Sequence, residues 1–203
     1  MKVNGDATLH APAEKVWEAL LDPAILVRTI PGCERLETVE ENTYAMTVTV
    51  GVAAIRGTYA GTCALHDLQA PTSLRLSAEG SGTPGTISAD VDVRLEDNGD
   101  GTTSLSYESE MLVGGMIAGV GQRMLGSVSR RLSAEFLGAV DGVLTGTAVE
   151  TVPAGPVREA VPGVYTAPPP AASAQQDFLR GVAVGAGLVT LGVVLGSLVG
   201  RRR

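Results

Sequence analysis

The sequence predicts an α+β domain in which a curved antiparallel sheet wraps around one long C-terminal helix. A proline-rich linker and a membrane-spanning helix are expected to follow. Through most of residues 44–113 apolar residues alternate with polar ones, as in antiparallel strands with one solvated face. From 117 to 143 they recur every three or four positions, as on an amphipathic helix. Residues 181–200 then carry no charge, which is typical of a membrane span.

These patterns divide the 203 residues into a folded domain (1–146), a flexible linker (147–177) and a membrane anchor (178–203). The net charge of the chain is -7, but residues 1–179 hold 22 acidic and 11 basic side chains, a net charge of -11. A surface of that sign argues against nucleic acid as a partner, because phosphate binding needs basic side chains. It also argues against binding to anionic lipid through surface charge.

The first elements are marked by proline. Weak alternation over 3–10 predicts a strand, and Ala11-Pro12 then opens a helix, since proline is tolerated in a first turn. Asp22-Pro23 ends that helix, and a second short helix is expected over 24–29. The strands that follow form a meander of about six, with alternating runs at 44–50, 55–65, 74–78, 87–95 and 105–113. Residues 97–101 (DNGDG) predict a tight hairpin.

The last element of the domain is a helix of roughly seven turns, because apolar residues recur at helical spacing from Ile117 to Val143. Packing this apolar stripe across the concave face of the sheet is the natural way to bury both.

Three motifs resemble the CoxG family of carbon monoxide dehydrogenase proteins, and the order of elements is similar to the START-like, helix-grip fold of the SRPBCC superfamily. The residues that carry the resemblance are Ala11-Pro12, Val16-Trp17, Leu20 and Asp22-Pro23, then Ile30-Pro31-Gly32-Cys33, then Gly57-Thr58-Tyr59-Ala60-Gly61. The resemblance covers residues 1–146. It implies an accessory protein that does not itself carry out redox chemistry. Such a protein acts with a cytoplasmic molybdenum CO dehydrogenase and helps to recruit it to the inner face of the cell membrane.

The tail is expected to anchor the chain. About 20 apolar residues at 1.5 Å each cross a hydrocarbon core of roughly 30 Å, and a buried core helix is the alternative. Residues 1–6 lack the apolar stretch of a secretory signal, so we expect a single-pass anchor with the main domain in the cytoplasm. The expected membrane-facing residues are Phe178, Leu179, Val182, Val184, Leu188, Val189, Leu191, Val193, Val194, Leu195, Leu198 and Val199.

An apolar cavity is expected between sheet and helix. Gly57 and Gly61 remove side chains from the inner face of a strand, and methionine suits adaptable apolar sites. A closed core, in which glycine only permits close packing, is the alternative. The expected ligand-binding residues are Met46, Val48, Tyr59, Cys63, Leu76, Val91, Val93, Tyr107, Met111, Met116, Ile117, Val120, Met124 and Val128.

No catalytic or metal-binding constellation stands out. His66 and Asp67 are adjacent on a predicted strand, so their side chains should point to opposite faces. We therefore expect a non-catalytic protein without a metal or a covalently bound cofactor. Because the implied partner releases electrons in the cytoplasm, the hypothesis is that the cavity binds a respiratory quinone, menaquinone. The alternatives are a membrane-anchoring scaffold with a filled core and a general START-like lipid-binding or transfer protein. A START-like enzyme would need an inward-facing acid or base.

Overall fold

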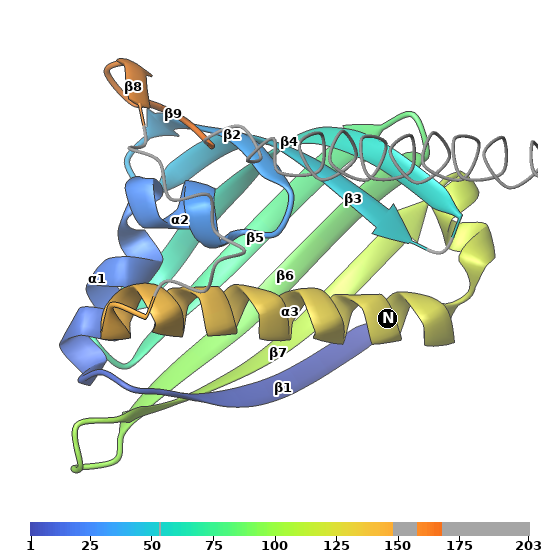
Figure 1. The fold of residues 1–203 in the computed structure, drawn as a ribbon. Helices are drawn as coiled ribbons and strands as arrows, with labels where there is room; N and C mark the ends of the chain where they lie inside the picture. The colour runs from blue at the N-terminus through green and yellow to red at the C-terminus, as the bar shows by residue number, and fades with distance from the viewer. Residues whose placement is uncertain (53, 148–157, 168–203) are drawn as a thin grey trace, which may run out of the picture. The chain divides into compact units, whose positions relative to one another are not determined.

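In the computed structural model, which describes residues 1–52, 54–147 and 158–167, one long helix lies across the concave face of a curved sheet (Figure 1). The elements in chain order are β1 (Lys2–Leu9), α1 (Ala13–Leu21), α2 (Pro23–Thr29), β2 (Cys33–Glu40), β3 (Thr43–Val52), β4 (Ile55–Gln69), β5 (Ser73–Gly82), β6 (Gly85–Asp97), β7 (Thr103–Gly114), the 3₁₀ helix η1 (Met116–Val120), α3 (Gln122–Thr145), β8 (Arg158–Val161) and β9 (Val164–Thr166). The predicted antiparallel sheet with a C-terminal helix is confirmed.

The sheet has the strand order β1-β7-β6-β5-β4-β3-β2-β9-β8, and neighbouring strands pair antiparallel. The run from β2 to β7 is the predicted six-strand meander, although the alternation did not locate β2 itself. The N-terminal strand β1 closes the sheet on the far side by pairing with β7, with Gly5 opposite Tyr107. Consequently β1 and the last strand of the meander lie side by side under α3 (Figure 1).

The two short helices form where the sequence places their start signals. Pro12 precedes α1, and the side chain of Asp22 caps α2 by accepting a hydrogen bond from the Ala24 amide at 2.8 Å. The β6–β7 hairpin is also as predicted. There the Asp97 carboxylate accepts the Gly99 amide at 2.8 Å, and the Asp100 carboxylate accepts the amide and hydroxyl of Thr102.

The prediction of one continuous helix from Ile117 is wrong. The chain leaves β7 through the 3₁₀ helix η1, and α3 begins only after Gly121, whose φ is +92°. A residue with a side chain rarely adopts such an angle, so this glycine permits the break. The 3₁₀ turn has about three residues per turn, which changes the faces on which residues 116–120 lie.

A short hairpin lies within the range expected to be a linker. The strand β9 pairs with β2, with Tyr165 opposite Leu36, and the Ala167 amide donates to the Glu34 carbonyl at 3.1 Å. Tyr165 packs on the cluster around Leu36 and Tyr44. The hairpin was not foreseen because strands of three and four residues are too short to show a period.

No helix among the described residues has the length and hydropathy of a bilayer span. The predicted anchor over 178–203 lies outside those residues, as does most of the predicted linker.

The core consists of three buried clusters spread along α3. One gathers β1, α1 and the far ends of the strands around Trp17 and Leu137. A second joins α2 and β2 around Leu36. The third joins Val52 and Ile117 with other residues at the η1 end of the sheet.

Candidate functional site

A cavity of about 430 Å³ lies between the concave face of the sheet and α3. Its volume falls within the range of about 300–1,000 Å³ that is typical of small-molecule sites. Strands β2 to β7 and β1 form its floor, α3 its roof, and α1 and α2 one end. None of the residues that line it is Asp, Glu, Lys, Arg or His. Since an unpaired charge would be costly here, the cavity suits an uncharged, apolar ligand.

The few polar groups of the cavity differ in what they can offer. The Tyr44 hydroxyl already donates to the Leu21 carbonyl at 3.2 Å, and Ser129 donates to the sulfur of Met111 at 3.6 Å. Within the described residues the Tyr107 hydroxyl has no hydrogen-bond partner of its own. It is therefore the group best placed to bond a polar atom of a ligand.

The cavity also contains one thiol. Burial raises the pKa of Cys63 to about 12, so this side chain stays neutral near neutral pH. Because the thiolate is the nucleophilic form, Cys63 acts as an apolar wall rather than as a catalytic group.

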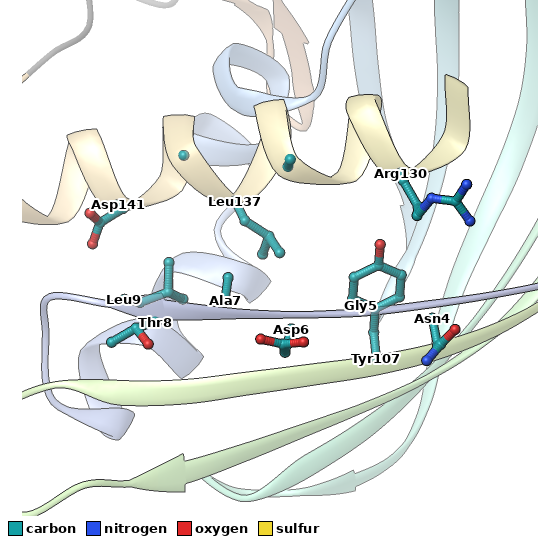
Figure 2. Close-up of a pocket in the computed structure, with 12 residues that line it drawn as sticks. Asn4, Gly5, Asp6, Ala7, Thr8, Leu9, Tyr107, Arg130, Leu137 and Asp141 are labelled. Carbon is teal, nitrogen blue, oxygen red and sulfur yellow. The ribbon is translucent and has the colours of Figure 1, made fainter. Parts of the chain in front are cut away.

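A second, more polar groove of about 420 Å³ runs between β1 and α3. Figure 2 shows residues 4–9 of β1 along one side, with Arg130, Leu137 and Asp141 projecting from α3 on the other. The Tyr107 ring rises from β7 past β1, with its hydroxyl directed toward α3.

Tyr107 and Leu137 line both the cavity and the groove, so these two side chains form the partition between them. Space for the Tyr107 ring comes from Gly5, because a Cβ at this position would lie 2.7 Å from the tyrosine oxygen. The partition therefore depends on a glycine in β1.

The groove is closed at one end by His10 and Asp141. The carboxylate of Asp141 accepts the His10 amide at 2.6 Å and lies 2.9 Å from the imidazole Nδ1. This pair ties the end of β1 to α3, which gives the histidine a structural role.

Half of the predicted ligand-binding residues line the cavity. These are Met46, Cys63, Leu76, Val91, Val93, Tyr107 and Met111. All seven come from strands, because the period of two correctly identified the inner face of the sheet.

The other seven lie elsewhere. Tyr59, Ile117, Val120 and Val128 belong to the core cluster at the η1 end, and Val48 packs against the cluster of α2 and β2. Met116 and Met124 are exposed, so the expectation that they face the interior is wrong. The cause is the break at Gly121, which ends the helical register on which that expectation depended.

Sequence reasoning missed the end wall and most of the roof. The end wall comes from Leu20, Leu26, Ile30, Pro31 and Leu36. The roof comes from Ser129, Leu132, Ser133, Phe136 and Leu137 of α3. The apolar spacing of Leu132 and Phe136 was visible in the sequence, but nothing there distinguished roof from core.

Comparisons with known proteins place this geometry in a family. The profile of the carbon monoxide dehydrogenase CoxG family matches residues 5–144. A conserved protein from Geobacillus kaustophilus is 33% identical, with a TM-score of 0.70 over 73% of this chain and 98% of its own. No curated protein matches the sequence.

Two more distant structures share the fold alone. The ZhuI aromatase/cyclase from Streptomyces sp. R1128 is 21% identical, with a TM-score of 0.55 over 71% of this chain and 93% of its own. A START superfamily protein from Mycobacterium smegmatis is 12% identical, with a TM-score of 0.56 over 72% of this chain and 98% of its own.

Proposed function

Because the chain belongs to the carbon monoxide dehydrogenase CoxG family, we propose that it is a non-catalytic accessory protein of a molybdenum CO dehydrogenase. In this proposal it recruits the enzyme to the inner face of the cell membrane. It also binds a respiratory quinone, menaquinone, in the cavity under α3, and so links the enzyme to the respiratory chain.

The observation that supports quinone binding is the chemistry of the cavity wall. A quinone has a long apolar tail and an uncharged ring with two carbonyl oxygens. The lining offers apolar side chains throughout and no charge. The Tyr107 hydroxyl, which has no other partner among the described residues, would donate a hydrogen bond to a quinone carbonyl. A bound quinone could then leave the bilayer, whose apolar interior otherwise retains it.

The family supports an accessory role, and the lining agrees with it. General acid–base catalysis needs a titratable group within reach of the substrate. The lining has no carboxylate or imidazole, and burial holds its one thiol neutral. Recruitment to the membrane rests on the family and on the apolar sequence of residues 181–200.

The experiment is to purify the full chain from cells that make quinone, extract it with organic solvent and identify the extracted molecules by mass spectrometry. Stoichiometric menaquinone, together with co-purified CO dehydrogenase, is the expected result. Phospholipid or fatty acid in its place would indicate a general lipid-transfer protein. An empty protein that also fails to bind added menaquinone would leave only a scaffold.

A further inference from the structure

Three segments meet at the end of the domain where α3 begins, and we call this region the η1 end. They are the β3–β4 turn (50–57), the β5–β6 turn (82–86) and the stretch from β7 through η1 into α3 (112–124). The Ile117 amide donates to the Pro84 carbonyl at 3.1 Å, which joins the third segment to the second. In Figure 1 this is the end of the sheet where the yellow chain turns from β7 into α3.

The first segment is packed against the second just as closely. A Cβ on Gly57 would lie 2.2 Å from the Cγ of Pro84, and Tyr59 lies in one cluster with Ile117. The three segments thus form a single surface at the η1 end.

Large apolar side chains are exposed on this surface. Leu112 is 75% exposed, Met116 62% and Met124 46%. In the described part of the chain only two other large apolar side chains, Val39 of β2 and Leu68 of β4, are exposed. Exposed apolar side chains that gather in one place mark a contact surface.

The charge of this surface is opposite to that of the domain. None of the three segments contains Asp or Glu, whereas Arg56 and Arg123 are both present and exposed. On β7 the first acidic residue outside the surface is Glu110, which pairs with Lys2 at 2.6 Å. On β5 the first is Glu79. The net charge of the whole domain therefore hides a positive, acid-free tip.

We propose that the η1 end docks on an anionic lipid surface. Leu112, Met116 and Met124 enter the boundary between head groups and acyl chains, while Arg56 and Arg123 lie against the phosphates. Interfacial binding strengthens with buried apolar area and with attraction to anionic lipid, and this tip offers both. The proposal concerns the folded domain, so it depends neither on the tail nor on the ligand in the cavity.

The docked orientation would bring the cluster of Val52, Tyr59, Ile117 and Leu125 next to the membrane. This cluster lies at the same end of the sheet as the tip, so the lipid surface would lie close to the interior of the domain.

A fluorescent label on the tip tests the proposal in the full chain. Burial raises the pKa of Cys33 to about 11 and that of Cys63 to about 12, so a cysteine introduced at the surface is labelled selectively near neutral pH. One variant carries an environment-sensitive fluorophore at Met116→Cys. The matched control carries it at Val39→Cys, which replaces another exposed apolar residue, among the glutamates of β2.

Vesicles of phosphatidylcholine are compared with vesicles that also contain phosphatidylglycerol. The label at position 116 should shift to shorter wavelength and be quenched by a nitroxide-bearing lipid, on the anionic vesicles above all, whereas the label at position 39 should change little. Equal responses at the two positions, or a response at 116 that ignores phosphatidylglycerol, would overturn the proposal, and so would a failure of the chain to bind the vesicles.

A charge reversal provides the second arm. Arg123→Glu should weaken the response at position 116 by about fivefold or more, since each basic residue near an anionic surface contributes roughly this factor. Arg94→Glu, which changes an exposed arginine in the middle of β6, should leave it unchanged. Equal effects of the two reversals would refute the role of the tip. An empty cavity would refute quinone binding and leave these results untouched.

Discussion

Tyr107 occupies the space that Gly5 leaves open on the neighbouring strand. The two residues are paired across β1 and β7, and a Cβ on Gly5 would lie 2.7 Å from the tyrosine oxygen. The ring held in this position separates the apolar cavity from the polar groove beneath α3, together with Leu137 (Figure 2). A single glycine in the N-terminal strand thus shapes the wall of the ligand site.

The Gly5–Tyr107 contact predicts a strong coupling between the two positions. Gly5→Ala should lower the free energy of unfolding by about 1–3 kcal/mol, because the new methyl group forces the ring aside. In a Tyr107→Ala background the same change should cost much less, by about 0.5–3 kcal/mol of interaction energy. Denaturant unfolding of the four proteins measures the cycle, and additive effects would show that the ring does not depend on the glycine.

Thr103 should be important for joining β7 to the start of α1. It is fully buried, and its hydroxyl donates to the Ala11 carbonyl at 2.7 Å. Thr103→Val keeps the shape but leaves that carbonyl unpaired, so we expect a loss of about 1–3 kcal/mol. Thr103→Ser, which keeps the hydroxyl, is the control for the hydrogen bond. Thermal unfolding compares them, and a Val variant as stable as the wild type would contradict the assignment.

The two buried cysteines predict slow thiol chemistry in the folded state. Burial raises the pKa of Cys33 to about 11 and that of Cys63 to about 12, against an ordinary value of 9.0. At pH 8 a disulfide reagent should therefore react slowly with the native protein and quickly with the protein in denaturant. Rapid modification of both thiols under native conditions would show that the cavity wall is open.

The same shifts give a pH dependence of stability. The unfolded thiols ionise near pH 9, whereas the folded thiols stay neutral until pH 11 or above. Above pH 9 the unfolded state therefore holds fewer protons, and the cysteine contribution to the free energy of unfolding decreases as the pH rises toward 11. Replacing both cysteines by alanine should flatten this part of the profile, which denaturant titrations at several pH values would measure.

The sequence was sufficient for the architecture because its signals are local and strong. Period-two alternation located β3 to β7, Asp22-Pro23 separated α1 from α2, and residues 97–101 marked the β6–β7 hairpin. The inner face of the sheet followed from that alternation, which is why Met46, Val91 and Tyr107 were correctly placed.

What could not be predicted depends on contacts between distant segments. The break at Gly121 follows from the packing of η1 against Pro84 and Gly85, and no local pattern encodes it. The end wall of the cavity needs Leu36 and Ile30 to meet across a corner of the fold. The positive tip likewise arises only when three separate turns come together, whereas the net charge of the chain averages it away.

Filling the cavity tests the central claim most directly. Ala89 lies on its floor opposite Ala78, so Ala89→Phe should occupy the ligand's space, and Ala60→Phe, on the exposed side of β4, is the matched control. The single tryptophan, Trp17, shares a cluster with Leu74 and Leu137 of the cavity wall, so its fluorescence should be quenched when a quinone binds.

The decisive measurement is a titration of the full chain with a menaquinone analogue, followed by this quenching, with circular dichroism to confirm folding. A smaller substitution, Ala78→Leu, serves if the Ala89 variant does not fold. We expect saturable binding to the wild type and the Ala60 variant, and an affinity at least about tenfold lower in the filled protein, equivalent to ~1.4 kcal/mol. Equal affinity in all of these proteins, or no saturable binding to the wild type, would contradict a quinone site under α3.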